Sequence, residues 1–271
     1  MPEPAVPTIV AEPLSPELLS RVGLLSSFPP APARFDPGAG WIHNYRIATC
    51  HGYLDRGNRN VGFLQIERIA GGQKTFTLRL LQRILNDEGA VHLLQGDMHC
   101  ERDACASLHG WRLASSFQDL DGNTIPGLGA KESGNIFAGV VTTMFGVQVL
   151  KQDLVRRLSA DWSLFEAVQR LPFGPVLAPA FDLLEGLRLL REEHRLVYRG
   201  RYNWKGAPAS LHWFHQIGFG LLPYEYWLDE RHRLLVAATH ARAYILDDEA
   251  EAVFEQTRKQ LQDRARRRND A

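Results

Sequence analysis

"LPYEYWLDERHRLLVAATHARAYIL", residues 222–246, is the stretch that decides the fold. Two runs rich in aromatic and β-branched residues flank a short polar segment, residues 229–232. Such runs favour strands, and a short polar connection between them favours a hairpin. The stretch therefore predicts two antiparallel strands, residues 224–228 and 233–246, joined by a tight turn.

The same alternation of apolar runs and turn residues recurs on the N-terminal side of this hairpin. Gly, Asn and Asp separate the runs at residues 55–58, 71–72, 86–89 and 119–123. These connections are too short for a helical crossover, so neighbouring strands should be antiparallel. The further strands predicted are residues 41–51, 61–69, 75–86, 91–99, 111–117, 133–143, 187–191, 195–202 and 210–219. We therefore expect an all-β, mainly antiparallel fold, with one large curled sheet or open barrel of about ten strands.

Two helices are expected beside the sheet. Ser163 followed by Glu166 fits a capping box and Pro172 stops the run, so a short helix is predicted over residues 164–171. Residues 248–271 begin acidic and end basic with a narrow apolar stripe, which predicts a C-terminal amphipathic helix. The pattern of residues 147–160 fits either a helix or a strand.

The N-terminal region is rich in proline, at positions 2, 4, 7, 13, 16, 29, 30 and 32. Proline removes backbone donors and favours extended, solvated chain. We therefore expect a flexible tail over residues 1–40, with one short helical turn at residues 16–23 and ordered structure beginning near Trp41. No repeat or shift of composition divides the remainder, so residues 41–247 should form a single antiparallel β domain.

Charge and hydropathy exclude several classes of protein. The 31 basic and 31 acidic side chains of the 271-residue chain cancel, so the chain lacks the positive field that drives binding to nucleic acid. No run reaches the roughly 18–20 apolar residues that span a bilayer, which excludes an integral membrane protein. The N-terminus lacks the basic and apolar regions of a signal peptide. The expected location is the cytoplasm by default, or an exported one if the true start lies upstream.

The motif "HCERDACASLHGW", residues 99–111, concentrates His99, Cys100, Cys105 and His109. Cys100 and Cys105 lie at the two ends of a four-residue hairpin connection, a geometry that permits a disulfide. Their spacing also suits the wide end of a zinc knuckle with His109 as a further ligand, whereas His99 points to the opposite face of its strand. Three alternatives stay open: unlinked structural thiols, a Cys100–Cys105 disulfide, or a metal site of Cys100, Cys105 and His109.

A second cluster, residues 211–227, is aromatic. Alternation along a strand places Trp213, His215 and Phe219 on one face. Together with Tyr224 and Tyr226 on a concave sheet face, they would provide apolar walls with a few polar groups, the usual composition of a small-molecule cavity. The alternative is an aromatic core strand that binds nothing.

Signatures of common enzyme classes do not occur in the sequence. It contains no G-x-S-x-G elbow, no H-E-x-x-H motif and no dinucleotide-binding fingerprint. Residues 119–123 resemble the start of a calcium loop but lack its later ligands. We therefore predict no catalytic residue and no cofactor.

Tyr226, Asp229 and Tyr244 mark a strand, an Asp-containing turn and a strand with a Tyr near its end. With residues 100–117, this pattern resembles uncharacterised bacterial proteins of the domain-of-unknown-function type. These are built on one long, curved antiparallel sheet that is similar in outline to lipoprotein-carrier half-barrels. The resemblance implies the same fold and an apolar-ligand role, and it carries over no catalytic residue.

One functional hypothesis and two alternatives follow. The hypothesis is non-enzymatic binding of an apolar or lipid-like small molecule on the concave face of the sheet, through Trp213, His215, Phe219, Tyr224 and Tyr226. The alternatives are a metal-dependent enzyme that uses the Cys/His motif, and a structural or partner-binding module without a ligand. The sequence leaves the oligomeric state open.

Overall fold

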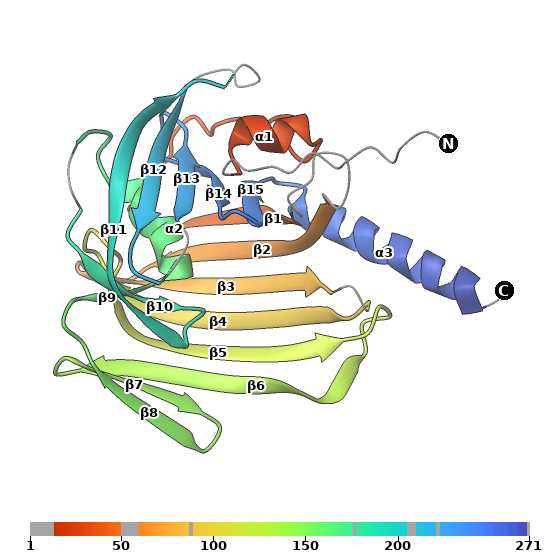
Figure 1. Ribbon diagram of the computed structural model, residues 1–271, viewed down its shortest axis with the longest axis horizontal. Coiled ribbons are helices and arrows are strands. Elements are labelled where there is room, and N and C mark those ends of the chain that lie inside the picture. The colour runs from red at the N-terminus through yellow and green to blue at the C-terminus, as the bar shows by residue number, and fades with distance from the viewer. Residues whose placement is uncertain are drawn as a thin grey trace, which may run out of the picture.

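The computed structural model describes residues 14–49, 59–86, 89–175, 178–204, 210–220 and 223–269. These residues form a single sheet of fifteen strands with three helices (Figure 1). The strands are β1 (Trp41–Thr49), β2 (Arg59–Ala70), β3 (Thr75–Leu85), β4 (Val91–Glu101), β5 (Leu108–Gln118), β6 (Thr124–Phe137), β7 (Val140–Phe145), β8 (Gln148–Asp153), β9 (Leu158–Ala160), β10 (Phe181–Glu185), β11 (Leu189–Tyr202), β12 (Leu211–Ile217), β13 (Tyr224–Leu228), β14 (Leu234–Ala238) and β15 (Arg242–Leu246). The helices are α1 (Pro16–Arg21), α2 (Asp161–Arg170) and α3 (Ala250–Asn269).

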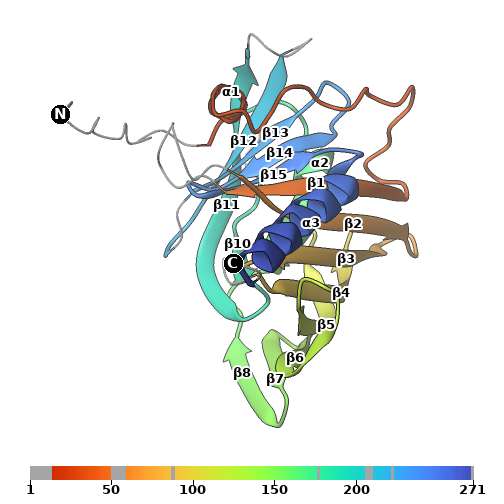
Figure 2. The same ribbon diagram turned by 90° about the vertical axis from the view of Figure 1, so that its right-hand side faces the viewer.

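The sheet consists of two meanders that meet where the first and last strands pair. β1 pairs with β2 on one side and with β15 on the other, both antiparallel. From this junction the order runs outward to β8 in one direction and to β9 in the other. β8 and β9 do not pair with each other, so the sheet curls without closing into a barrel; Figure 2 shows it from the side. The predicted fold class is confirmed, and β9 with β10 is the parallel pair within it.

Helix α2 lies inside the curl and carries the centre of the core. The ring of Phe165 meets four tyrosine rings edge-on, with centroid distances of 5.5 Å to Tyr45, 6.5 Å to Tyr224, 6.2 Å to Tyr226 and 5.4 Å to Tyr244. Edge-on contacts of this kind stabilise beyond the burial of apolar area. We call the face of the sheet that bears these tyrosines the inner face, and the opposite face the outer face.

Helix α3 packs on the outer face of β1 and β2. Its Phe254 is buried in a small cluster with Phe63 and Leu85, separate from the main core. The apolar stripe predicted for the C-terminal helix therefore packs against the outer face of the sheet. None of the described helices is both long and apolar enough to cross a membrane.

Helix α1 lies beside β13, β14 and β15 (Figures 1 and 2), and its Leu18 and Leu19 are buried. The extended segment that follows is held by Arg233, whose guanidinium donates to the carbonyls of Pro29 and Pro30, both at 3.0 Å. Ordered packing thus begins before Trp41. The sequence did not reveal it because buried leucines alternate with the prolines of this region.

Three predicted segments divide differently in the structure. Residues 233–246 form two strands, β14 and β15, separated by a turn in which the Thr239 amide donates to the Arg242 carbonyl at 2.8 Å. Residues 133–143 span β6 and β7, with a tight turn at Ala138 and Gly139, both at positive φ. The ambiguous residues 147–160 contain β8 and β9. These strand boundaries could not be predicted, because the short turns between the strands contain neither proline nor paired glycines.

The central helix starts three residues earlier than predicted. Its N-cap is Ala160, and the hydroxyl of Ser163 accepts the Ala160 amide at 2.9 Å from inside the first turn. Glu166 therefore lies in the middle of the helix and is fully buried. The predicted capping box is therefore wrong. Glu166 does not lie at the start of the helix, because its carboxylate pairs with Arg68 and Arg170 in the core.

Candidate functional site

A pocket of about 560 Å³ opens at the N-terminal end of α2, between the helix and the turn that joins β14 to β15. This size lies within the usual range for small-molecule sites. We call it the Asp161 pocket, and its lining residues are Thr49, Asp161, Trp162, Phe165, Glu185, Arg191, Gly220, Tyr224, Thr239, His240, Ala241, Arg242 and Tyr244.

The wall of the Asp161 pocket is aromatic. Tyr224 and Tyr226 stack on each other with ring centroids 5.2 Å apart, and both pack against Phe165. Burial raises the pKa of the hydroxyls of Tyr224, Tyr226 and Tyr244 above the ordinary value. These hydroxyls therefore stay protonated near neutral pH. That of Tyr226 donates to the side-chain oxygen of Gln216 at 2.8 Å, whereas Tyr224 and Tyr244 line the pocket, where a protonated hydroxyl can act as a donor.

Asp161 is the first residue of α2, where a carboxylate is favoured by the helix dipole. Its side chain accepts the Gly186 amide at 2.7 Å. Burial outweighs this hydrogen bond and raises the pKa of the carboxyl to about 6. Asp161 thus changes charge near neutral pH, a property that is common in functional sites.

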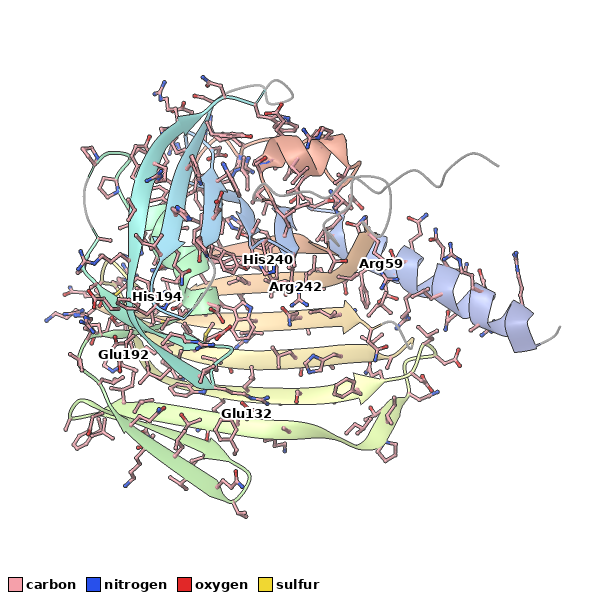
Figure 3. All side chains as sticks on the ribbon, in the orientation of Figure 1. Arg59, Glu132, Glu192, His194, His240 and Arg242 are labelled. Atoms are coloured by element: carbon pink, nitrogen blue, oxygen red, sulfur yellow. The ribbon has the colours of Figure 1, made fainter. Side chains whose placement is uncertain are left out.

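Two arginines line the pocket, and only one of them has an ion-pair partner. The side chain of Arg191 forms an ion pair with Glu185 at 3.0 Å, so its charge is compensated. Arg242 lies on β15 (Figure 3), two residues before Tyr244 and on the same inner face of the strand, and both residues line the pocket. Within the described part of the chain, no carboxylate pairs with Arg242. Arg242 therefore brings an uncompensated positive charge to the aromatic wall.

The predicted ligand-binding residues are divided between two faces. Tyr224 lines the pocket and Tyr226 packs behind it. Trp213 pairs with Trp227, and His215 pairs with Glu225, so both predicted residues point to the outer face. Phe219 follows the end of β12 and is 70% exposed. The structure thus brings together only the two tyrosines of the predicted set, because adjacent strands place Tyr226 opposite Phe214 rather than opposite Trp213.

The Cys/His motif forms the connection between β4 and β5. Cys100 and Cys105 are free, buried thiols, so the structure shows unlinked thiols in place of the considered disulfide. Burial raises the pKa of Cys105 to about 11 and that of Cys100 further. His109 lies at the surface and pairs with Glu101 at 3.0 Å. No cluster of three or more His, Cys, Asp or Glu able to hold a metal occurs among the described residues, and Cys50 lies outside them.

The same connection is fastened to α2 and β9. Asp103 accepts the Ser107 hydroxyl at 2.6 Å, and its carbonyl accepts from Arg170 of α2, also at 2.6 Å. The Ser159 hydroxyl donates to the carbonyl of Cys105 at 2.6 Å. These bonds give the motif a structural role: it anchors the first meander to the central helix.

Sequence reasoning missed Asp161 and Arg242, the charged members of the pocket. Asp161 was outside the predicted helix because of the misplaced capping box. A signal for Arg242 did exist, since alternation along a strand puts Arg242 and Tyr244 on the same face. The sequence carries no signal for the turn at residues 239–241, which brings the start of this strand close to the helix.

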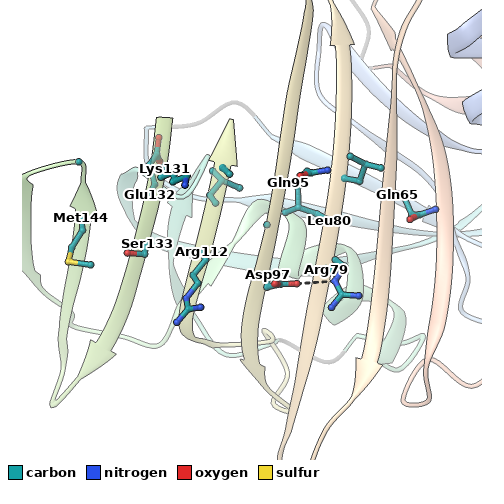
Figure 4. Close-up of a pocket in the computed structure, with 15 residues that line it drawn as sticks. Gln65, Arg79, Leu80, Gln95, Asp97, Arg112, Lys131, Glu132, Ser133 and Met144 are labelled. Carbon is teal, nitrogen blue, oxygen red and sulfur yellow. Dashed lines mark hydrogen bonds and ion pairs between the residues drawn. The ribbon is translucent and has the colours of Figure 1, made fainter. Parts of the chain in front are cut away.

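A larger hollow of about 770 Å³ lies on the outer face of β2–β7. Figure 4 shows that it is lined by side chains of several neighbouring strands, with the ion pair of Arg79 and Asp97 at 3.2 Å near its centre. Arg112 and Lys131 also line it, and both are exposed. No aromatic side chain lines this trough, so it is less suited to hold an apolar molecule than the Asp161 pocket.

Comparison with known proteins yields a likeness of fold. No family model matches the chain, and no curated protein sequence matches it. Among solved structures, the crystal structure of a β-barrel-like protein of the domain of unknown function DUF1849 from Brucella abortus is similar, with a TM-score of 0.49 and 10% sequence identity. The match covers 78% of this chain and 96% of that one. This neighbour is, like the proteins that the sequence resembles, one of the domain-of-unknown-function type.

Proposed function

We propose that the chain binds, without catalysis, a small molecule with an apolar body and an anionic end in the Asp161 pocket. The observation that carries this proposal is the position of Arg242. Its guanidinium has no carboxylate partner among the described residues and lies beside the hydroxyl of Tyr244 at an aromatic wall. Charge-assisted hydrogen bonds from arginine to a carboxylate are among the strong polar contacts in proteins.

The aromatic wall supports the apolar part of the proposed ligand. Trp162, Phe165, Tyr224 and Tyr244 are each less than a tenth exposed and present ring surface to the pocket. Apolar area removed from water stabilises a complex by about 25 cal/mol per Å² before the costs of association are subtracted. A short aliphatic or aromatic body would gain from this wall, whereas a sugar or nucleotide would leave its polar groups unpaired there.

In mildly acidic solution, the charge balance of the pocket favours an anion over a cation. Arg191 and Glu185 neutralise each other at 3.0 Å, which leaves Arg242 and Asp161 to set the sign. Because the carboxyl of Asp161 has its pKa raised to about 6, part of its negative charge is lost in mildly acidic solution. A carboxylate or similar group beside Arg242 then meets a net positive site.

The test is a titration of purified protein with dansyl-labelled undecanoic acid, followed by fluorescence, with undecanol as an uncharged competitor. We expect saturable binding that Arg242→Met weakens about tenfold or more, the size of a lost charge-assisted hydrogen bond. The matched control is Arg199→Met, since Arg199 lies over the Trp213 ring on the outer face and should leave the affinity unchanged.

Two results would contradict the proposal. One is an absence of saturable binding by the dansyl probe in protein that melts cooperatively. The other is equal affinity of the Arg242→Met and Arg199→Met proteins, because the probe would then bind away from Arg242. Stronger displacement by undecanol than by undecanoate would likewise overturn the anionic part of the proposal.

A further inference from the structure

Strand β8 forms a free edge of the sheet. It pairs with β7 on one side and is the terminal strand of the sheet on the other (Figure 1). Its residues are exposed except for Gln152, which is half-buried. The strand at the opposite end, β9, is three residues long and entirely buried. A long exposed edge invites pairing with another chain, and natural proteins usually block it.

The hydrogen bonds of β8 with β7 fix which of its backbone groups face the open edge. The amide of Leu154 donates to the carbonyl of Gly139 at 2.7 Å, in the same register as the rest of the pair. In antiparallel pairs, the N–H and C=O groups of alternate residues point to the same neighbour. The backbone groups of Leu150 and Gln152 therefore face β7, and those of Val149, Lys151 and Asp153 face outward.

We propose that β8 pairs with the β8 strand of a second copy of this chain, antiparallel and centred on Gln152. The outward backbone groups restrict self-pairing to registers that place odd-numbered residues opposite odd-numbered ones. A register centred on Lys151 puts two lysines face to face, and one centred on Asp153 puts two aspartates face to face. Like charges directly opposite each other are destabilising. Centring on Gln152 instead places Lys151 opposite the partner's Asp153, and by symmetry repeats the pair.

Apolar side chains agree with the same register. Val149 is 59% exposed and Val155 is 76% exposed. Val155 lies in a bend two residues past the end of β8, and pairing that continues beyond the strand would bring Val149 opposite the partner's Val155, again twice. Neither Lys151 nor Asp153 has an ion-pair partner among the described side chains, so both are available for the partner. The charge complementarity of Lys151 and Asp153 within β8 is what identifies the second copy as the occupant of this edge.

The test uses charge reversal, which tells this interface from a non-specific one. Sedimentation equilibrium over a concentration series should show a reversible dimer for the natural chain. Lys151→Asp and Asp153→Lys should each weaken dimerisation about tenfold or more, because two attractive cross-strand pairs become two repulsive ones. An equimolar mixture of these two variants should form a heterodimer, since each repelled residue then meets the opposite charge. The double variant K151D/D153K should dimerise like the natural chain.

Thermal melts serve as the folding control, and both exposed substitutions should leave the melting temperature almost unchanged. The proposal is overturned if the natural chain is monomeric throughout the series, or if the two single variants dimerise as well as the natural chain. It is also overturned if neither the equimolar mixture nor the double variant forms a dimer. The ligand pocket lies on α2 and is not involved, so these outcomes are independent of the proposed function.

Discussion

Arg68 of β2 and Glu166 of α2 form a fully buried ion pair, with 2.8 Å between Nε and Oε1 and no exposed side-chain surface on either residue. Arg170 pairs with the same carboxylate at 2.7 Å. The Arg68 guanidinium also lies 4.4 Å from the centre of the Phe76 ring and donates to the carbonyl of Ala39 at 2.7 Å. The Glu166 carboxylate thus joins the central helix to the first meander, and Arg68 extends the link to the segment that leads into β1.

Removing the charge of Glu166 should destabilise the fold strongly. Glu166→Gln leaves the buried guanidinium of Arg68 without its counter-ion, and breaking a buried pair in this way costs about 3–5 kcal/mol. The measurement is the free energy of unfolding in urea. Arg79→Met, which breaks an exposed pair with Asp97, is the control and should cost less than about 1 kcal/mol. If the two variants lost equal free energy of unfolding, the buried pair would contribute no more to stability than the exposed one.

Phe165 should be among the most costly side chains to truncate. Phe165→Ala leaves a cavity between four tyrosine rings, and such substitutions cost about 3–5 kcal/mol. Phe219→Ala is the matched control, because Phe219 is 70% exposed and its loss should change stability by no more than about 0.5 kcal/mol. Urea denaturation of both variants measures the difference, and a small loss for Phe165→Ala would place the core elsewhere.

Stability should depend on pH through Asp161. Its folded-state pKa is raised to about 6 from an ordinary value of 3.8, so folding favours the protonated form. This contribution is fully present below the ordinary pKa and is lost as the pH rises through about 6. Asp161→Asn should lack this loss between about pH 4 and 7. Parallel pH profiles of the two proteins in urea titrations would contradict the assignment.

Ligand affinity should follow the same ionisation in the proposed site. As the pH rises through about 6, the Asp161 carboxylate becomes charged and repels an anionic probe, so the affinity for dansyl-undecanoate should fall. Asp161→Asn should flatten this profile. His240→Gln is the control for the histidine in the same pocket and should leave the fall in place. A profile that flattens with His240→Gln alone would assign the pH dependence to the histidine.

The two cysteines of the β4–β5 connection should be unreactive in the folded protein. Both are buried, and burial raises their thiol pKa values, so little thiolate is present at neutral pH. In a Cys50→Ser variant, a thiol reagent such as dithionitrobenzoate should modify Cys100 and Cys105 only after unfolding. A mass 2 Da lower in non-reduced than in reduced protein would instead reveal a disulfide.

The sequence by itself determined the sheet and its antiparallel order. Period-two alternation and short polar turns act between residues that are close in the chain, so the hairpin of β13 and β14 follows from residues 224–238 alone. The C-terminal helix follows in the same way from a local pattern of charge and apolar residues. Alternation along β13 likewise places Tyr224 and Tyr226 on one face, where their rings stack on each other.

Only the tertiary structure decided which residues meet across the curl. Arg68 and Glu166 are 98 residues apart, and nothing local to either position predicts their contact. The pairing of β1 with β15, and the insertion of α2 between the meanders, set the inner face. They place Arg242 in one pocket with Asp161 and Phe165, and they turn Trp213 and His215 to the other side. Long-range packing, which has no periodic signature in the sequence, therefore defined the pocket.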